Sequence, residues 1–366
     1  MRSVGFVALV MSLMILLSSC WVNQNNLWAV DKLPSISPTS REVTEANIAY
    51  GDEDLQKLDL YLPASEVRGI IVWFHPGGWC CGDKVDIDPI ILSTIDSGYA
   101  VVSVNYRLVP TVTAEQQLAD ADRALRFVKA SRRAWGAGAG KVIVAGGSAG
   151  GTLALLLAGA PGQFSGPDLG LLAGIDPQVD AVISLVGPSD LRSYIDGETG
   201  EWVSGLAEGF LGCSNRGSQW PTSPTTSTTS TLPVAPRPTV APTKDRVWEL
   251  SSISLVEPST AASDVSSGSS GMPPCDPNRV LKFSPILWAV LAELFGGDLP
   301  PAYLAYGDRD SVVPPSSQGV VLHDWWSAGG SWLETYYDNP PTGGHNLSNE
   351  MNATAFSLWL GLFGFP

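Results

Sequence analysis

The chain has 366 residues, of which 44% are hydrophobic and 16% are charged, with 38 glycines and 28 prolines. This composition can bury a sizeable core, which excludes a wholly disordered chain and a disulfide-stapled miniprotein. The 36 acidic residues outnumber the 21 lysines and arginines, giving a net charge of −15. Because such a protein repels phosphate backbones, we expect no nucleic-acid partner.

Residues 1–20 have the pattern of a signal peptide. Arg2 supplies positive charge, and the apolar run 7–17 is too short to span a bilayer as a mature helix. The run ends in Leu-Ser-Ser-Cys20, which resembles the bacterial lipoprotein cleavage box. That resemblance implies a lipidated Cys20 and membrane attachment through it, with ordinary secretion as the alternative. Both readings predict an extracytoplasmic protein, in which disulfides are permitted.

Two segments of the chain after residue 20 lack a regular pattern. Residues 21–40 form a polar, flexible tether, and 41–366 form one α/β domain interrupted by a low-complexity insertion, 214–274. Within the insertion, 221–243 consists almost entirely of Pro, Thr, Ser and small residues. This composition cannot offset the entropy of ordering, so the insertion is predicted to be disordered. A lid, a glycosylated spacer and a tolerated surface insertion are its possible roles.

The sequence of the domain predicts strands that alternate with helices. Nearly continuous apolar runs predict strands that are covered on both faces, at 69–74, 100–105, 141–145, 181–186, 302–306 and 333–337. An apolar stripe predicts a helix from Ala114 to about Trp135, and Thr113 with Gln116 fits a capping box before it. The alternation indicates a mostly parallel, doubly wound sheet flanked by helices.

Four cysteines remain after the leader, and they allow three pairings. A bond between the adjacent Cys80 and Cys81 would be strained, because neighbouring Cα atoms lie only about 3.8 Å apart. We therefore hypothesise a disulfide between Cys213 and Cys275, which would clamp the base of the insertion. In the chain-entropy model, closing that loop stabilises the fold by roughly 4 kcal/mol.

The strongest chemical signal is the segment 141–151, KVIVAGGSAGG, followed by an apolar run. A strand leads directly into G-x-S-x-G and then into a helix, which is the context of a nucleophile elbow. The glycines permit a turn too tight for side chains beside Ser148. That turn lifts the hydroxyl group to the sheet edge, at a helix N-terminus that favours negative charge.

A nucleophilic serine needs a base, and the chain offers three histidines. His345 lies in a Gly-rich loop after the last predicted strand, where the imidazole can reach the sheet edge. His323 lies in a helix-like segment and is interpreted as a packed or surface residue. His75 precedes the nucleophile in the chain. We therefore assign His345 as the base.

The orienting carboxylate is expected between the nucleophile and the base in sequence. The run 301–314 is a strand followed by a short acidic turn that contains Asp308 and Asp310. Asp310 is assigned the role of holding the tautomer and orientation of His345, with Asp308 as the fallback. The resulting order, Ser148, Asp310, His345, is that of the α/β-hydrolases.

Oxyanion stabilisation is predicted at a Gly-rich bend, His75-Pro-Gly77-Gly78, that ends a strand. Glycines let backbone N–H groups approach a substrate oxygen without steric obstruction. We expect the N–H groups of Gly77, Gly78 and Ala149 to form the oxyanion hole. One such donor contributes about 3 kcal/mol to lowering the barrier.

Seven segments together resemble the α/β-hydrolase carboxylesterases of the hormone-sensitive-lipase and bacterial feruloyl-esterase-like (BD-FAE-like) groups. They are 58–63 (LDLYLP), 75–79 (HPGGW), 104–108 (VNYRL), 146–151, 210–212 (FLG), 284–286 (SPI) and 307–314. The resemblance implies acylation of Ser148 by a small-molecule ester and release of the acyl group to water. Relatives usually have HGGG where this chain has His-Pro-Gly-Gly, and often have Asp or Glu at the position of Gly147.

Other classes of function remain as alternatives. A catalytically silent scaffold serving as a binding or surface-attached protein would normally have lost a triad residue, and a serine peptidase of this order typically has a large second domain. Three scattered histidines lack metal-ligand spacing, and nucleotide fingerprints are absent, so no metal and no cofactor is expected. Trp73, Trp79, Trp325 and Trp326 either line an aromatic pocket or belong to the core.

Overall fold

The computed structural model describes residues 42–196, 200–215, 272–330, 335–347 and 351–362. The predicted signal peptide with Cys20, the tether 21–40 and residues 216–271 of the predicted insertion lie outside these ranges. Across the described ranges, no helix has both the length and the apolar character needed to cross a bilayer.

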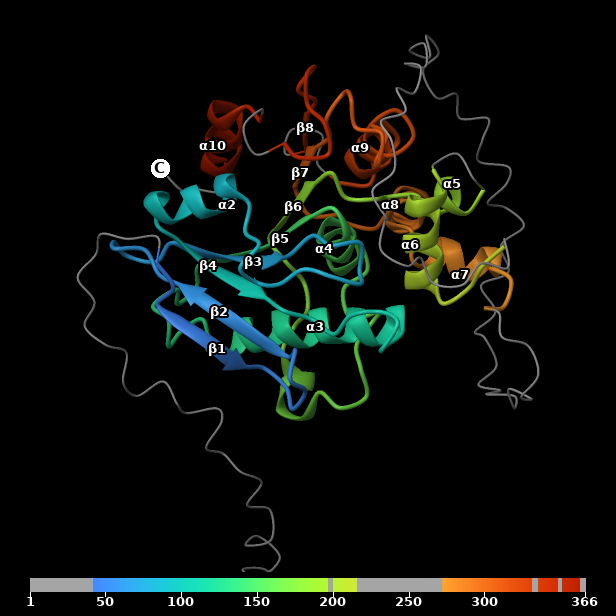
Figure 1. Ribbon diagram of the computed structural model, residues 1–366. Coiled ribbons are helices and arrows are strands. Elements are labelled where there is room, and N and C mark those ends of the chain that lie inside the picture. Colours follow the sequence, from blue (N-terminus) through green and yellow to red (C-terminus); the bar gives the residue numbers. More distant parts are fainter. Residues whose placement is uncertain (1–41, 197–199, 216–271, 331–334, 348–350, 363–366) are drawn as a thin grey trace, which may run out of the picture. The chain divides into compact units, whose positions relative to one another are not determined.

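A mixed sheet organises the described part of the chain, with the strand order β1-β2-β4-β3-β5-β6-β7-β8 (Figure 1). β2 pairs antiparallel with β1 and β4, and the other neighbours pair in parallel. The predicted mostly parallel sheet is therefore confirmed. The strands are β1 Glu45–Ala49, β2 Lys57–Tyr61, β3 Gly69–Phe74, β4 Tyr99–Val104, β5 Lys141–Gly147, β6 Ala181–Leu185, β7 Ala302–Ala305 and β8 Tyr336–Asp338.

The sequence predicts the central strands more accurately than the edges. β3 to β7 lie within two residues of the predicted bounds, because they are buried on both faces and read as apolar runs. β1 is mostly exposed, so it carries no such run and was not predicted. The last strand was predicted at 333–337; β8 instead runs to Asp338, and 331–334 lie outside the described residues.

Helices cover both faces of the sheet (Figure 1). α2 and α10 pack on one face, and α3, α4 and α9 contact the strands from the other. The helices are α2 Pro89–Ser93, η2 Thr94–Ser97, α3 Ala114–Ser131, α4 Ala149–Gly159, η3 Gly170–Gly174, α5 Arg192–Ile195, α6 Glu201–Leu211, α7 Pro277–Lys282, α8 Pro285–Phe295, α9 Gly319–Ala328 and α10 Ala353–Gly361.

The predicted capping box at the start of α3 is present. Gln116 N–H donates to Thr113 Oγ1 (3.3 Å), and Thr113 N–H donates to Gln116 Oε1 (3.0 Å). The helix ends at Ser131, about four residues earlier than predicted. The reason is that the chain turns back there, which buries Trp135 against Phe127 with ring centroids 6.3 Å apart.

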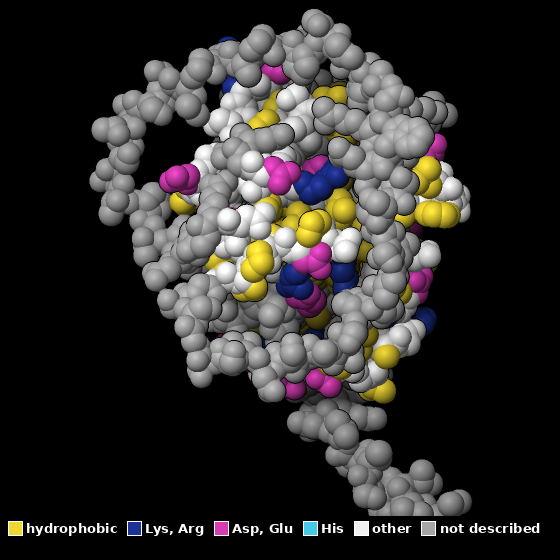
Figure 2. Space-filling view, turned by 90° about the vertical axis from the view of Figure 1, so that its right-hand side faces the viewer, with side chains coloured by type: hydrophobic (Ala, Val, Ile, Leu, Met, Phe, Trp, Pro, Cys, Tyr) yellow, Lys and Arg dark blue, Asp and Glu magenta, His cyan; other side chains and the backbone are white. Residues whose placement is uncertain are grey.

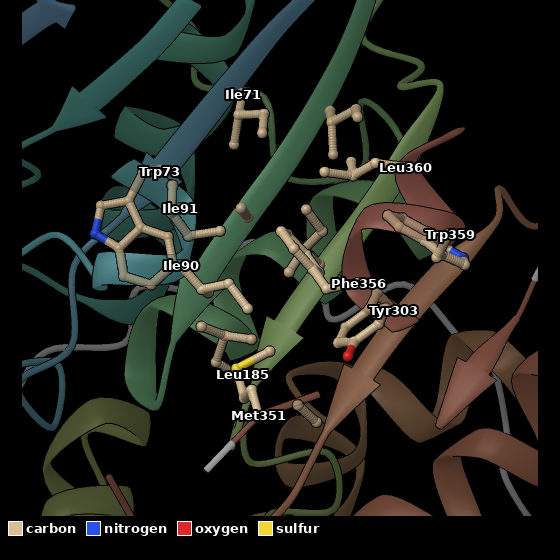
Figure 3. Close-up of a cluster of buried hydrophobic side chains, with 14 of the residues drawn as sticks. Ile71, Trp73, Ile90, Ile91, Leu185, Tyr303, Met351, Phe356, Trp359 and Leu360 are labelled. Atoms are coloured by element: carbon tan, nitrogen blue, oxygen red, sulfur yellow. The ribbon is translucent and has the colours of Figure 1, made fainter. Parts of the chain in front are cut away.

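A hydrophobic cluster fills the space between the sheet and the α2/α10 side (Figure 3). Trp73 projects from β3 toward Ile90 and Ile91 of α2, while Tyr303 of β7 lies beside Phe356 and Trp359 of α10. The Trp73 ring is 1% exposed, and its Nε1 donates to the Asp86 carbonyl at 2.9 Å. Trp73 is therefore a core residue.

The Cys213–Cys275 pair predicted from the sequence is a disulfide in the structure. Beside it, Ser214 N–H donates to Pro273 O (2.7 Å), and Ser214 Oγ donates to the buried Glu208 at 2.9 Å. Both margins of the predicted 214–274 insertion are thus hydrogen-bonded parts of the fold. Composition does not register these anchoring bonds, and the boundaries of the insertion stay a prediction.

Charge is interspersed on the side of the molecule that carries α6 and α7. In Figure 2, described acidic and basic side chains lie next to each other there, with hydrophobic side chains among them. An ion pair joins Arg279 of α7 to Glu115 of α3, with Arg279 Nη2 donating to Glu115 Oε2 at 3.0 Å. Arg279 Nε also donates to Leu211 O at 2.7 Å, so this one side chain ties α7 to both α3 and α6.

Replacing both disulfide cysteines, Cys213→Ser with Cys275→Ser, is expected to lower the free energy of unfolding by roughly 4 kcal/mol. The reason is that the bond joins residues 62 apart and restricts the unfolded chain. Urea unfolding under non-reducing conditions measures the loss, with reduced wild-type protein as the control. An unchanged unfolding midpoint would contradict the clamping role of the disulfide.

Candidate active site

Ser148 lies in a sharp turn between β5 and α4. Its backbone has φ 49° and ψ −119°, a conformation that side-chain-bearing residues rarely adopt. Ser148 N–H donates to Leu185 O at the end of β6 (2.8 Å), and Ser148 O accepts from Thr152 N–H (3.2 Å). The strand, turn and helix predicted around Ser148 are therefore all present.

Two glycines of the motif are required by close backbone approach. A Cβ atom on Gly146 would lie 2.1 Å from Gly150 O, and one on Gly150 would lie 2.0 Å from Phe74 O. The turn thus packs directly against the carboxyl end of β3. This contact brings the serine turn to the start of the loop that carries Gly77 and Gly78.

The carboxylate of Asp310 is fixed from two sides. Its Oδ1 accepts N–H bonds from Val312 (2.8 Å) and Val313 (2.9 Å), and its Oδ2 lies 2.8 Å from His345 Nδ1. The Asp310 side chain is fully buried. Asp308, the fallback carboxylate, is exposed and lies 3.5 Å from the Asn339 amide instead.

The loops that bear Asp310 and His345 are bonded to each other. Arg309 N–H donates to Gly343 O at 2.8 Å, and Asp308 N–H donates to Pro340 O at 3.2 Å. A Cβ atom on Gly307 would lie 2.3 Å from Gly343 O, so only glycine permits this approach. These contacts tie the Gly-rich loop of His345 to the acid loop.

His345 connects the acid to the serine. Its Nε2 lies 3.0 Å from Ser148 Oγ, while its Nδ1 faces the Asp310 carboxylate. Since an ionised carboxylate only accepts hydrogen bonds, Nδ1 carries the proton and Nε2 is free to accept from the serine hydroxyl. The structure therefore brings together the three residues that the sequence nominated as nucleophile, base and acid.

The predicted oxyanion loop follows β3 and contains several left-handed residues. Gly77 and Gly78 have φ values of 132° and 58°, and Trp79 has 63°. A Cβ on Gly78 would lie 2.8 Å from the side chain of Leu206 of α6, and the positive φ of Gly78 would strain any other residue there. Ala149, which supplies the third predicted donor, is the first residue of α4. Their role in binding an oxyanion remains a prediction.

Aromatic contacts hold this loop on both sides. His75 stacks on Tyr106 with centroids 4.3 Å apart, and Tyr106 Oη donates to His75 O at 2.8 Å. Trp79 stacks on Phe210 of α6 at 4.7 Å, and its carbonyl accepts from Gln117 Nε2 at 2.9 Å. The loop is thereby fixed between α3, α6 and the residues after β4.

The contribution of α6 to the site is one that sequence reasoning missed. The segment Phe210-Leu-Gly was recognised as part of the resemblance, but neither its stacking on Trp79 nor the contact of Leu206 with Gly78 could be derived from spacing. Both contacts join residues more than 120 positions apart, and no local pattern encodes them.

Apart from Trp79, which belongs to the predicted oxyanion loop, the remaining sequence candidates lie on α9. Trp79 and Trp326 are buried, and Trp325 is half-buried on α9. His323 also lies on α9, where its ring is 5.6 Å from that of Tyr337. Within the described ranges, no three His, Cys, Asp or Glu side chains are grouped so that they could hold a metal ion.

Comparisons with known proteins point to one class. Residues 58–230 match the family model BD-FAE. Esterase LipI of Mycobacterium tuberculosis is 36% identical over 101 residues, 27% of this chain and 32% of the relative. Carboxylesterase NlhH of the same species is 33% identical over 139 residues, 37% and 43% of the two chains. The chain thus spans less than half the length of these relatives.

Solved structures resemble the fold over most of the chain. A truncated carbohydrate esterase from gut microbiota has a TM-score of 0.62 at 18% identity, covering 90% of this chain and 98% of the other. Native esterase 2 of Thermogutta terrifontis has a TM-score of 0.54 at 19% identity, covering 89% and 91%.

The sheet, the serine turn and these likenesses show that the chain has the α/β-hydrolase fold. The matched segments are similar to the BD-FAE family and to proteins named esterase and carboxylesterase, in agreement with the resemblance seen in the sequence. The family match ends at residue 230, so Asp310 and His345 lie beyond the matched range.

Acid is expected to weaken the fold through His75. Burial lowers the pKa of His75, against the opposing effects of its hydrogen bond to Pro76 O and of Asp83 and Asp86. The unfolded chain therefore binds this proton more readily, and stability falls as the pH drops through about 6.5, by at most about 1.4 kcal/mol per pH unit.

A His75→Asn variant tests this effect, because its amide can still donate to Pro76 O but does not titrate. Urea unfolding at pH 7.5 and 5.5 is expected to show a smaller loss of stability in the variant than in wild type. Equal losses would mean that His75 does not contribute to the acid sensitivity.

Proposed function

We propose that the protein is a serine carboxylic-ester hydrolase that uses Ser148 as nucleophile, His345 as base and Asp310 as orienting acid. The observation that carries the proposal is the chain of contacts from Ser148 Oγ to His345 Nε2 (3.0 Å) and from His345 Nδ1 to Asp310 Oδ2 (2.8 Å). These are the distances that nucleophile activation by a general base requires.

The first half-reaction forms an acyl-enzyme. Ser148 Oγ attacks the carbonyl carbon of the ester while its proton passes to His345 Nε2, and the buried Asp310 stabilises the resulting imidazolium. The negative charge on the carbonyl oxygen is held by the N–H groups of Gly77, Gly78 and Ala149. The C–O bond to the alcohol then breaks, and the leaving oxygen takes the proton from His345.

The second half-reaction regenerates the serine. A water molecule gives its proton to His345 Nε2 and attacks the acyl carbon, forming a second tetrahedral intermediate at the same oxyanion site. Collapse of this intermediate returns the proton to Ser148 Oγ and releases the carboxylic acid. The same imidazole nitrogen therefore transfers every proton in the cycle.

The substrate class is a small-molecule carboxylic ester. The names of the similar proteins include esterase, carboxylesterase and carbohydrate esterase, which supports this class. A catalytically silent scaffold is disfavoured because all three triad side chains are retained within hydrogen-bonding distance.

We also propose that the enzyme is exported and anchored to a membrane through a lipidated Cys20. The support for this location is the sequence of residues 1–20, with its charged start, apolar run and terminal Leu-Ser-Ser-Cys. Secretion without the lipid is the competing outcome.

The carboxylate assignment is tested by a matched pair of variants, Asp310→Asn and Asp308→Asn. Asp310→Asn is expected to lower kcat on p-nitrophenyl esters by about 10³- to 10⁴-fold, because the amide disrupts the required His345 tautomer. The exposed Asp308→Asn is expected to stay within about twofold of wild type, since its carboxylate does not contact His345.

Ser148→Ala sets the background rate in the same assay. Comparable losses in the two aspartate variants would reject the assignment of Asp310, and wild-type activity no greater than that of Ser148→Ala would reject the esterase itself.

Lipidation is tested by detergent-phase partitioning of the protein from a bacterial host. Wild type is expected in the detergent phase. Cys20→Ala is expected in the aqueous phase, because this variant lacks the thiol that would receive the lipid. Wild-type protein that enters the aqueous phase, with its mature N-terminus unmodified, would instead indicate secretion.

A further inference from the structure

Two adjacent cysteines lie in the loop that carries Gly77 and Gly78. The Sγ atoms of Cys80 and Cys81 are 2.8 Å apart, and both residues are free of disulfide bonds. Cys81 is exposed and Cys80 is partly buried. The thiol pair is thus accessible from solvent, and the triad does not use it.

The backbone of this pair fixes one peptide unit of the predicted oxyanion hole. Gly77 O accepts N–H bonds from Cys80 (3.2 Å) and Cys81 (3.0 Å), and Cys80 Sγ lies 3.6 Å from the same oxygen. In a trans peptide the C=O and N–H bonds point in opposite directions. Holding Gly77 O therefore also fixes the direction of the Gly78 N–H, one of the predicted oxyanion donors.

This peptide unit has little room to adopt another position. A Cβ atom on Gly77 would lie 2.1 Å from Cys81 O, and one on Gly82 would lie 2.3 Å from Pro76 O. The backbone of the cysteine pair therefore lies in a closely packed turn. A change in the backbone between Cys80 and Cys81 must shift either that turn or the Gly77 peptide.

We propose that Cys80 and Cys81 form a reversible redox-modification site that controls the orientation of the Gly77–Gly78 peptide. This inference rests on the proposed esterase function for its effect on activity. The oxidant is a low-molecular-weight disulfide. The Cys81 thiolate attacks one of its sulfurs and releases one thiol; Cys80 then attacks Cys81 Sγ and releases the second. The net exchange converts two protein thiols and one disulfide into a vicinal disulfide and two small thiols.

The geometry determines both the order and the reversibility of the exchange. Cys81 reacts first because it is the exposed thiol. Burial, followed by the neighbouring Cys81, raises the pKa of Cys80 to about 12, so Cys80 does not supply the first thiolate. A bond between adjacent residues is strained, since their Cα atoms are closer than an unstrained disulfide allows, and strained disulfides are readily reduced.

Ring closure acts on the site through the Cys81 N–H. This group belongs to the peptide bond inside the eight-membered ring, so closure reorients it and weakens its 3.0 Å bond to Gly77 O. The Gly77–Gly78 peptide then keeps only the bond from Cys80 N–H, so the Gly78 N–H is held less firmly toward the oxyanion. Because that donor acts on the transition state, we expect kcat to fall and KM to change little.

The test uses the full chain treated with oxidised glutathione and then with a mild thiol. Trypsin cleavage after Arg68 and Lys84 gives a peptide, 69–84, that contains Cys80 and Cys81 and no other cysteine. Oxidation is expected to remove two hydrogens from this peptide and to lower kcat at least about tenfold, with both effects reversed by the thiol. The Cys80→Ser, Cys81→Ser double variant keeps both backbone N–H groups and is expected to show the same kcat in both conditions.

Each outcome decides the proposal. A peptide that retains its hydrogens, or that carries only glutathione, overturns the modification site. A vicinal disulfide that leaves kcat unchanged overturns its control of the oxyanion peptide. If wild type lacks esterase activity in both states, the proposed function fails, and hydrogen exchange in peptide 69–84 then decides the redox proposal: faster exchange on oxidation supports it, and unchanged exchange overturns it.

Discussion

The site depends on one steric constraint, the direct contact of the serine turn with the end of β3. Gly150 lies so close to Phe74 O that a Cβ atom would approach it to 2.0 Å, and Gly146 lies equally close to Gly150 O. The contact does two things at once. It keeps Ser148 at a left-handed φ of 49°, and it brings the loop containing Gly77 and Gly78 beside the nucleophile. A side chain at Gly150 would separate these two parts of the site, and one at Gly146 would disrupt the serine turn itself.

A second glycine contact does the same for the acid and the base. Gly307 and Gly343 approach too closely for a Cβ atom, and backbone bonds between their loops set Asp310 against His345. Two backbone contacts between sheet-edge loops therefore determine the geometry of all three side chains. The loops after β5, β7 and β8 leave parallel strands of one sheet at the same edge. The strand order therefore places these loops close enough to make the contacts.

The sequence predicted those parts of the molecule that local pattern encodes. Ser148 was identified by the strand, tight turn and helix around it, and the central strands by their apolar runs. The choice of Asp310 over Asp308 agrees with the geometry, in which only Asp310 faces His345. What the sequence could not provide were long-range contacts: Leu206 of α6 against Gly78, the His75–Tyr106 stack and the bonds that tie the His345 loop to the acid loop. The exposed edge strand β1 was missed for a different reason, since it buries too little to leave an apolar run.

Covalent labelling shows directly whether Ser148 is the activated nucleophile. The full chain is treated with a fluorophosphonate, and the modified residue is identified by peptide mass spectrometry. The account predicts one adduct per chain, on Ser148, and a labelling rate that falls by orders of magnitude in His345→Asn, because the serine then has no base. An adduct on another residue, or labelling of Ser148 at an unchanged rate without His345, would contradict it.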